Sequence, residues 1–193
     1  MNNNKISKIV DTMAEYKGDV KDLIGYQRIT GYLIFDVKLG ENFRRKARAV
    51  ADGHQTKTPY SSTYSTVVSR DSVRICLTLA ALNDLELLSE DVESAYLSAP
   101  CREKVWLKAG PEFGKLEGRT FIVQKALYGL KSSGSAFRIF LAETLDDISF
   151  KSSIADPDVW MRAATKPYGE AYYGYIFCFV DDVLCISHDA AIL

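Results

Sequence analysis

The sequence is poor in the residues that build metal-bound and disulfide-linked folds, and it has no long hydrophobic run. It contains four cysteines and two histidines, with no C-x-x-C spacing, so we expect buried, reduced thiols instead of a zinc site. The longest uninterrupted apolar stretch runs from Tyr175 to Val180, far short of the roughly 20 residues of a membrane-spanning helix. The segment from Met1 to Lys5 is too polar to begin a secretory signal. These absences predict an intracellular protein with no membrane partner.

An excess of charge of one sign is also lacking, since the net charge is −1. The overall electrostatic signature of a nucleic-acid-binding protein is therefore missing. Locally, however, the segment from Phe43 to Arg48 carries four cations in six residues, and Lys57 follows it. Such a run is either a solvated face or a surface that contacts phosphate. The run alone leaves both interpretations open.

What is present is a globular composition, with 47% hydrophobic residues in a chain of 193, enough for one domain with a sizeable core. The first 25 residues are weakly patterned and predict an arm or a short helix. Ser69 and the spacing of the apolar residues after it predict a helix that ends near Asn83. A Gly/Ser-rich break over 129–134 precedes a second predicted helix, with an apolar stripe at Phe137, Phe140, Leu141 and Leu145.

The strand predictions come from short apolar segments bounded by turn residues. Residues 32–37 and 48–51 are predicted to form a hairpin with a turn at 40–42 and the cations near its tip. A buried strand at 85–88 is predicted to deliver Asp91. Further strands are predicted at 105–107, 121–123, 158–161, 172–180 and 183–186. Because helices and strands do not alternate regularly, we predict an α+β fold in which helices cover one face of a sheet.

Two adjacent carboxylates, Asp181 and Asp182, lie between two strongly apolar, strand-forming segments. Burying two like charges beside a core is unfavourable unless a cation or hydrogen-bond donors compensate them. An ordinary Asp-Asp turn that binds nothing is the simpler alternative. The local sequence therefore leaves a metal site and a plain turn both open.

A second strand-end acid, Asp91, strengthens the metal interpretation. Carboxylates at Asp91, Asp181 and Asp182 can hold two Mg²⁺ ions and leave room for substrate phosphates. Glu90 and Glu93 compete with Asp91, but their side chains are expected to point to other faces. A metal-dependent nuclease or phosphohydrolase uses similar carboxylate pairs, although no further His or acid cluster here supports one.

Four segments resemble motifs of copia-type retrotransposon reverse transcriptases, and they follow one another along this chain in the family's order. Asp91 to Leu97 is similar to the family's first catalytic motif, and Phe179 to Asp182 is similar to its Tyr-Val-Asp-Asp box, with Phe for Tyr. Lys125 to Lys131 matches the Ala-Leu-Tyr-Gly-Leu-Lys element, and Lys46 to His54 matches the Lys-Ala-Arg-x-Val-Ala-x-Gly-His segment. The resemblance covers roughly residues 26 to 187.

The resemblance implies an RNA-directed DNA polymerase domain of a retrotransposon polyprotein. Its expected fold is a right-hand polymerase fold, with a palm sheet, packed helices and an N-terminal fingers hairpin, but without the thumb. The implied organisation is an arm over 1–25, fingers and palm over 26–187, and a truncated C-terminal end over 188–193. The implied location is a cytoplasmic particle or the nucleus.

The resemblance also implies the chemistry and the partners. Asp91 and Asp181 are expected to ligate two Mg²⁺ ions, or Mn²⁺ in their place, with Asp182 in a supporting role. Deoxynucleoside triphosphates and an RNA or DNA template with its primer are the expected ligands. The reaction is two-metal nucleotidyl transfer, in which the primer 3′-hydroxyl displaces pyrophosphate at the α-phosphate.

Two further groups of residues follow from the same resemblance. The expected nucleotide-binding residues are Tyr96, Val92, Glu93, Lys46 and Arg48. Tyr96 is expected to exclude a ribose 2′-hydroxyl by bulk, with a core tyrosine as the alternative. One of the two fingers cations is expected to contact the triphosphate. The expected template-primer residues are Gly129, Lys131 and Tyr128, with a helix-start turn as the alternative for Gly129 and a solvated side chain for Lys131.

Departures from the family pattern leave a second function open. After Lys131 the family continues with Gln-Ala-Pro-Arg and a Trp, whereas this chain has a Ser/Gly-rich segment over 132–137. Glycine and serine there are expected to loosen the start of the following helix. The alternative is a truncated, inactive transposon remnant that acts at most as a folded interaction module.

Overall fold

The computed structural model describes residues 11–38, 43–59 and 62–192, and its chain forms two compact units. The first unit comprises Met1–Tyr64 and Tyr96–Phe137, and the second comprises Ser65–Ala95 and Arg138–Leu193. Both units are therefore built from two separate stretches of the sequence. No helix in the described ranges is long and apolar enough to cross a membrane.

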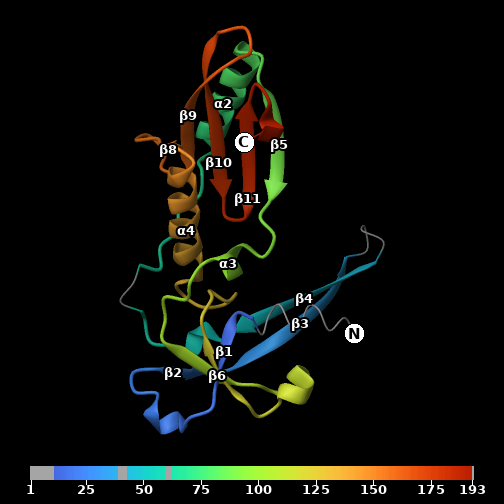
Figure 1. The fold of residues 1–193 in the computed structure, drawn as a ribbon, viewed down its shortest axis with the longest axis vertical. Helices are drawn as coiled ribbons and strands as arrows, with labels where there is room; N and C mark the ends of the chain where they lie inside the picture. Colours follow the sequence, from blue (N-terminus) through green and yellow to red (C-terminus); the bar gives the residue numbers. More distant parts are fainter. Residues whose placement is uncertain (1–10, 39–42, 60–61, 193) are drawn as a thin grey trace. The chain divides into compact units, whose positions relative to one another are not determined.

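The first unit contains a four-stranded sheet and a separate two-stranded hairpin (Figure 1). In the four-stranded sheet the order is β1-β7-β6-β2, with β2 parallel to β6 and the other neighbours antiparallel. The elements of this unit are β1 (Met13–Tyr16), η1 (Val20–Asp22), β2 (Gln27–Ile29), β3 (Gly31–Lys38), β4 (Arg44–Ala51), η2 (Gly53–Gln55), β6 (Val105–Lys108), η3 (Pro111–Leu116) and β7 (Thr120–Val123). The short helix α3 (Ala95–Ser98) begins at the boundary between the units.

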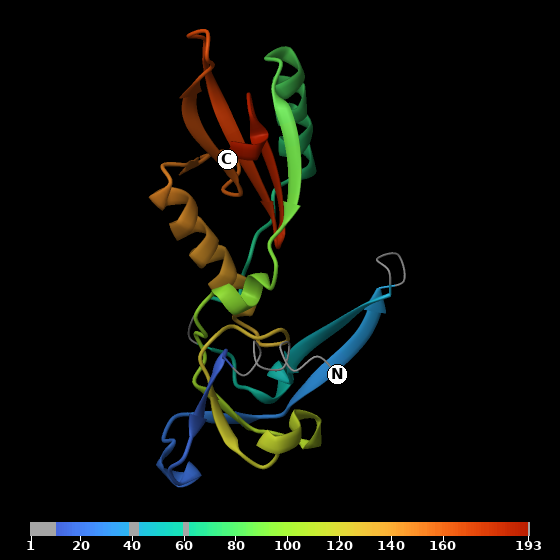
Figure 2. The ribbon, with the colours of Figure 1, turned by 45° about the vertical axis from the view of Figure 1, so that its right-hand side comes forward.

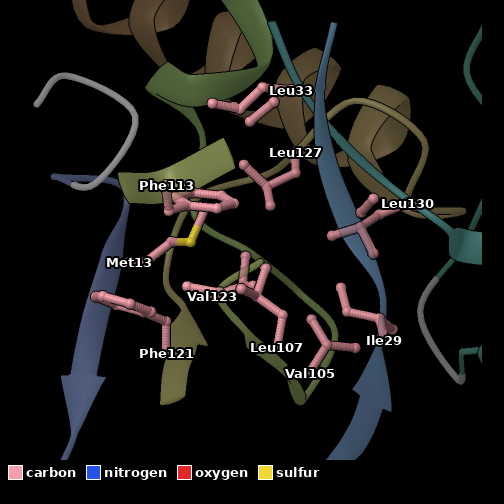
Figure 3. Packing of buried hydrophobic residues seen from close by; sticks show 13 residues of the cluster. Met13, Ile29, Leu33, Val105, Leu107, Phe113, Phe121, Val123, Leu127 and Leu130 are labelled. Carbon is pink, nitrogen blue, oxygen red and sulfur yellow. The ribbon is translucent and has the colours of Figure 1, made fainter. Parts of the chain in front are cut away.

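The core of the first unit lies against one face of the four-stranded sheet. Val105 and Leu107 of β6 are buried, while Trp106 between them is only half-buried, as the alternation of side chains along a strand requires. Figure 3 shows Phe113 and Leu127, from segments outside the sheet, closing this core. The core therefore joins the sheet to the segment that carries the 125–131 motif.

The second unit is a five-stranded antiparallel sheet with helices packed on it (Figures 1 and 2). The strand order is β5-β11-β10-β9-β8, so that β5 lies at an edge of the sheet. Its elements are α2 (Arg70–Leu82), β5 (Glu86–Asp91), β8 (Lys151–Ser152), β9 (Val159–Thr165), β10 (Ala171–Phe179), β11 (Asp182–Ser187) and η4 (Ala190–Ile192), together with the later part of α4 (Ser133–Asp147).

Helices cover both faces of this sheet, so the prediction that they cover one face is wrong. Cys76 and Ala80 of α2 pack in one cluster with Phe177, whereas Leu145 of α4 packs in another with Ile176. Phe177 and Ile176 are neighbours on β10 and point to opposite faces. Because the strand is apolar on both sides, its sequence allows a helix on each.

The start and end of α2 are confirmed as predicted. The Ser69 hydroxyl accepts a hydrogen bond from the Ser72 amide at 3.1 Å, and Asn83 caps the C-terminus. A carboxylate from outside the helix strengthens this start, since Asp156 accepts from the Ser69 amide at 2.9 Å and from the Ser72 hydroxyl at 2.6 Å. The sequence of α2 alone does not reveal this partner.

The predicted hairpin is present in the structure, whereas the N-terminal arm and the strand before Asp91 differ from their predictions. The hairpin predicted from residues 32–37 and 48–51 is confirmed as β3 and β4, while its turn at 40–42 lies outside the described residues. Residues 1–10 of the predicted arm lie outside them too, but 13–16 form β1, which pairs with β7 and is neither arm nor helix. The strand before Asp91 exists, but it is not buried, since Leu87 is 50% exposed at the sheet edge.

The start of α4 is firmly anchored, so the predicted loosening is wrong. Ser132 and Ser133 are almost fully buried. The Ser133 hydroxyl donates to the Leu127 carbonyl at 2.6 Å, and both the amide and the hydroxyl of Ser132 donate to the Glu103 carboxylate. Small polar side chains fit this site because each has a hydrogen-bond partner there.

Candidate active site

The second unit brings the acids of two motifs together at one end of its sheet. In the antiparallel pair of β11 and β5, Asp182 lies directly opposite Asp91. The amide of Val92 donates to the carbonyl of Asp181 at 2.8 Å. Directly opposed residues have Cβ atoms about 4.5–5.5 Å apart and face the same side of a sheet. The predicted convergence of the 91 and 181–182 segments is thus present in the backbone.

The β10–β11 hairpin holds these acids on a tight turn. Phe179 pairs with Asp182, which leaves Val180 and Asp181 as the two loop residues. Val180 has a φ of 58°, a left-handed conformation that a β-branched residue adopts only under strain. The turn was predicted at Asp181-Asp182, but Asp182 is already the first residue of β11.

The three carboxylates are accessible and have no cation to neutralise them among the described residues. Asp91 and Asp182 are exposed, and Asp181 is half-buried. By contrast, the buried Asp158 of the same unit is paired with Arg138, with Nε and Oδ1 2.8 Å apart. Carboxylates on paired segments that lack a cation partner favour a bound cation.

The donor set suits Mg²⁺, although the described side chains form no closed cage. Within residues 11–38, 43–59 and 62–192 no three His, Cys, Asp or Glu side chains converge as ligands of one metal ion. Mg²⁺ is usually held by one or two carboxylates together with substrate phosphates and water. Asp91, together with Asp181 and Asp182 on the hairpin that pairs with its strand, provides such a partial set of oxygen ligands. The site therefore fits a metal that is bound together with substrate.

The neighbours of Asp91 behave differently from it. Glu90 pairs with Val183 on β11, so its side chain lies on the opposite face of the sheet, as expected. Val92 is half-buried, and its amide is engaged by the hairpin, whereas Glu93 is exposed. Of the predicted nucleotide-binding residues, these two lie in the second unit, with the acids.

In the first unit, the 46–54 and 125–131 motifs pack against each other through two glycines. The Ala51 amide donates to the Tyr128 carbonyl at 2.7 Å. A Cβ on Gly129, whose φ is 91°, would lie 2.1 Å from the Ala51 carbonyl oxygen, and one on Gly53 would lie 2.1 Å from the Gly129 carbonyl oxygen. This close approach of two backbones, rather than a helix-start turn, explains the glycine at 129.

Tyr96 belongs to an aromatic group in the first unit. Its ring centroid lies 4.8 Å from that of Tyr128 and 6.1 Å from that of Phe137. Both Tyr96 and Tyr128 are half-buried, so their rings are supported by packing and still partly accessible. The group joins a predicted nucleotide-binding residue to a predicted template-primer residue.

Of the three predicted cations in the first unit, the structure describes the side chains of Lys131 and Arg48. Lys131 is not free in solvent, since its ammonium donates to the Thr56 carbonyl. Arg48 lies on β4 opposite Ile34 and is half-buried. Lys46 also lies on β4, but its side chain lies outside the described part of the chain. All three belong to the first unit.

Sequence reasoning missed the buried carboxylate Glu103. It accepts hydrogen bonds from the amide and hydroxyl of Ser132, at 2.9 and 2.8 Å, and from the Thr56 hydroxyl at 3.2 Å. Glu103 thus ties the segment after the 46–54 motif to the start of α4. A lone acid in a polar segment gives no sequence signal of this role, because its partners lie far away in the chain.

The prediction of buried thiols holds for only two of the four cysteines. All four are free, but Cys76 and Cys178 are buried whereas Cys101 and Cys185 are half-buried. Burial, helped by the charge of Asp158, raises the pKa of Cys178 to about 12. Burial likewise raises the pKa of Cys101 to about 11. Thiols that stay protonated at neutral pH are poor nucleophiles and poor metal ligands.

The sequence of this chain also matches a known protein family. The sequence profile described as reverse transcriptase (RNA-dependent DNA polymerase) matches residues 20–193. The chain therefore belongs to the reverse transcriptase family.

Within that family, the chain is similar to Pol polyproteins of copia-type transposons, which confirms the predicted resemblance. It is 29% identical over 154 residues to the retrovirus-related Pol polyprotein from transposon RE1 of Arabidopsis thaliana, and equally to that from transposon RE2. It is 28% identical over 155 residues to the polyprotein from transposon TNT 1-94 of Nicotiana tabacum. Each match covers 78% of this chain, but only 10% or 11% of the relative. The chain thus spans about a tenth of these polyproteins.

Proposed function

We propose that this chain is the fingers and palm portion of an RNA-directed DNA polymerase. It extends a primer, paired with an RNA or DNA template, by one deoxynucleotide at a time. The observation that carries the proposal is the cross-strand pairing of Asp91 with Asp182. This pairing brings the acids of two family motifs to the same end of the second unit's sheet. The pairing supports the proposal because both carboxylates are exposed and have no ion-pair partner among the described residues, so they are accessible to a cation.

In the proposed mechanism, Asp91 and Asp181 would hold two Mg²⁺ ions, with Asp182 in a supporting role. Bound there, the ions would supply a lowered pKa for the primer 3′-hydroxyl and a positive charge for the departing pyrophosphate. The chain contributes positioning, because the hydrogen bond from Val92 to Asp181 fixes the hairpin against β5. A fixed geometry matters here, since catalysis of phosphoryl transfer is almost entirely positioning and electrostatic stabilisation.

The remaining predicted residues are assigned to the two substrates. Tyr96 is assigned to the sugar of the incoming nucleotide, where its bulk excludes a 2′-hydroxyl, and Val92 and Glu93 are assigned to the same nucleotide. Lys46 and Arg48 lie on the basic hairpin, which neutralises the triphosphate. Tyr128, Gly129 and Lys131 line the path of the template and primer. The packing of Tyr96 against Tyr128 supports a common surface for nucleotide and template.

Extension of a primed homopolymer tests the proposal. The chain, together with its natural downstream sequence, is incubated with oligo(dT) on poly(rA), dTTP and either Mg²⁺ or Mn²⁺. Incorporation that disappears in Asp91→Asn and Asp181→Asn is the expected result. If the wild-type protein binds no metal and incorporates no nucleotide with either ion, the polymerase proposal is wrong and an inactive remnant takes its place.

A further inference from the structure

A pocket lies beside Asp182, on the α2 side of the sheet in the second unit. Its volume is about 310 Å³, and its lining includes Arg70, Ser89 and the apolar side chains of Phe177, Phe179 and Leu184. Asp182 forms part of the same wall. The volume is at the lower end of the range of ligand pockets, about 300–1,000 Å³, which suits a group no larger than one nucleotide unit.

Arg70 contributes to this pocket a positive charge that has no ion-pair partner among the described residues. It is the first residue of α2, it is exposed, and no carboxylate pairs with it among the residues that the structure describes. Arg74, one turn further along α2, instead pairs with Asp71 at 3.7 Å. A guanidinium at the N-terminus of a helix adds to the favourable potential for an anion that the helix itself provides.

The chemistry of the wall limits what can bind. A simple anion attracted by Arg70 would be repelled by Asp182 and would leave the apolar side chains uncovered. A purely apolar ligand would leave both charges unpaired and desolvated, which is unfavourable. A ligand with a phosphate at one end and a flat or ring-shaped apolar part satisfies both kinds of surface, because aromatic side chains pack against sugars and bases. A nucleotide has this composition.

We infer that this pocket holds one nucleotide unit of the polymerase substrate, with Arg70 contacting its phosphate. The inference rests on the proposed function and goes further, since it assigns Arg70 and Ser89 to substrate binding. The phosphate has two possible sources, which are a phosphodiester of the primer strand and the triphosphate of the incoming nucleotide. Separate measurements distinguish the two.

The first measurement is binding of the primed template by fluorescence anisotropy, without nucleotide. Oligo(dT) on labelled poly(rA) is titrated with the wild-type chain, Arg70→Ala and Arg74→Ala over a series of salt concentrations. If the phosphate belongs to the primer, Arg70→Ala weakens binding about three- to tenfold and lowers the slope of log K against log salt by about 1. Arg74→Ala, a matched arginine on the same helix, leaves the slope unchanged.

The second measurement is the KM for dTTP in primer extension. If the phosphate belongs to the incoming nucleotide, Arg70→Ala raises this KM about three- to tenfold, while the primed template binds as before. In either case Arg70→Lys restores most of the loss, because the positive charge is retained. A thermal melt checks that each variant folds.

A substitution that fills the pocket gives independent evidence. Ser89 is exposed on β5, so Ser89→Phe is expected to fold normally while its ring occupies the pocket. The variant should weaken the same ligand that Arg70→Ala weakens, but without changing the salt slope, since no charge is lost. Glu86→Phe, which places the same ring further along β5, is the control.

The results separate this inference from the proposed function. If the wild type extends primers, but Arg70→Ala matches it in affinity, salt slope and KM, the pocket is not a nucleotide site and the polymerase proposal stands. The inference also falls if Arg70→Ala and Arg74→Ala weaken binding equally. If the wild type binds the primed template with the expected dependence on Arg70 yet never extends it, the pocket assignment survives and the catalytic proposal does not.

Discussion

The two units hold their motif residues in opposite ways. In the first unit, Gly53 and Gly129 leave no room for a Cβ, and Tyr96 packs against Tyr128. In the second unit, Asp91 and Asp182 are exposed side chains with no described hydrogen bond or ion pair. The comparison suggests that motif residues of the first unit stabilise a surface, while those of the second are held ready for a ligand.

The difference follows from what the glycines of the first unit and the acids of the second contribute to folding. A glycine at a close backbone contact contributes only to the folded structure, because no other residue fits there. Exposed like charges contribute nothing favourable to folding and repel one another. Substitutions should therefore separate the units, with stability affected in the first and catalysis affected in the second.

The largest expected effect is on catalysis, for Asp91→Asn. We expect primer extension to fall roughly 10³-fold or more, since a lost metal ligand removes several kcal/mol of transition-state stabilisation. Stability should change by no more than about 0.5 kcal/mol, because the side chain is exposed. Single-turnover extension and urea unfolding measure the two quantities. Asp147→Asn, an exposed acid in the same unit, should change neither, and a large loss of stability in Asp91→Asn would break the comparison.

The next effect is on stability, for Gly129→Ala in the first unit. The added methyl meets the Ala51 carbonyl oxygen at 2.1 Å and also has to adopt a φ of 91°. We expect a loss of about 3 kcal/mol or more in the free energy of unfolding. Gly118→Ala is the control, since Gly118 has a φ of 80° but no atom within 4 Å of the added Cβ. It should lose only about 1–2 kcal/mol, and equal losses in the two variants would contradict the close-contact explanation.

A smaller effect is expected on sugar discrimination, for Tyr96→Val. If the tyrosine excludes a 2′-hydroxyl by bulk, the ratio of kcat/KM for dTTP over UTP should fall about tenfold or more. Tyr96→Phe keeps the ring and should keep the ratio. The measurement is steady-state extension with each nucleotide separately. An unchanged ratio in Tyr96→Val would reduce Tyr96 to a packing residue beside Tyr128.

Asp156 lies in the second unit but behaves like the residues of the first, because its carboxylate is buried and fully engaged. Burial alone would raise its pKa, but hydrogen bonds from Ser72, Ser69 and Asp158 outweigh this and lower the pKa below its ordinary value of 3.8. A lowered pKa contributes stability above pH 3.8 that is lost as the pH falls through the folded-state pKa.

Asp156→Asn should therefore destabilise the chain by about 2 kcal/mol at pH 7, since an amide group cannot accept all these hydrogen bonds. The difference from the wild type should shrink as the pH falls below 3.8. Urea unfolding at a series of pH values measures it. Asp71→Asn, at an exposed position on α2, should show little difference at any pH. A difference that stays constant down to low pH would argue against the ionised carboxylate.

The smallest expected effect is for Val180→Gly, in the turn between β10 and β11. Glycine relieves the left-handed strain at a φ of 58°, although it loses more entropy on folding. We expect a net gain in stability of about 0.5–1 kcal/mol. Extension should be slower because the turn is less rigid. Val183→Gly, at a residue that packs toward α4, should instead lose stability. A loss in both variants would show that Val180 is not strained.

Local signals in the sequence predicted the elements that position the acids of the candidate active site. The N-cap at Ser69 fixed α2, and the apolar segments around Asp181 and Asp182 predicted the β10–β11 hairpin. These features depend on neighbouring residues, which the sequence displays directly. The convergence of Asp91 with Asp181 and Asp182 was predicted from their chemistry and from the family resemblance, whereas the register that pairs Asp91 with Asp182 was not predicted.

The features that were missed depend on contacts between distant segments. Nothing in the sequence of residues 13–16 indicates that they pair with β7. Nothing around Glu103 indicates that it accepts hydrogen bonds from Ser132 and Thr56. The second helix on the sheet was missed because an apolar strand is compatible with a covered or a bare face. The reason for glycine at 129 was also hidden, since it depends on the backbone of Ala51.

The central claim is that the 91 and 181–182 segments share divalent ions, and iron-directed cleavage tests it most directly. Fe²⁺ with ascorbate and peroxide, bound in place of Mg²⁺, cuts the backbone close to the ion. The account predicts cuts near residue 91 and also near residues 181–182, both suppressed by excess Mg²⁺ and both lost in Asp91→Asn. Cuts at only one of the two segments, or cuts that Mg²⁺ does not suppress, would contradict it.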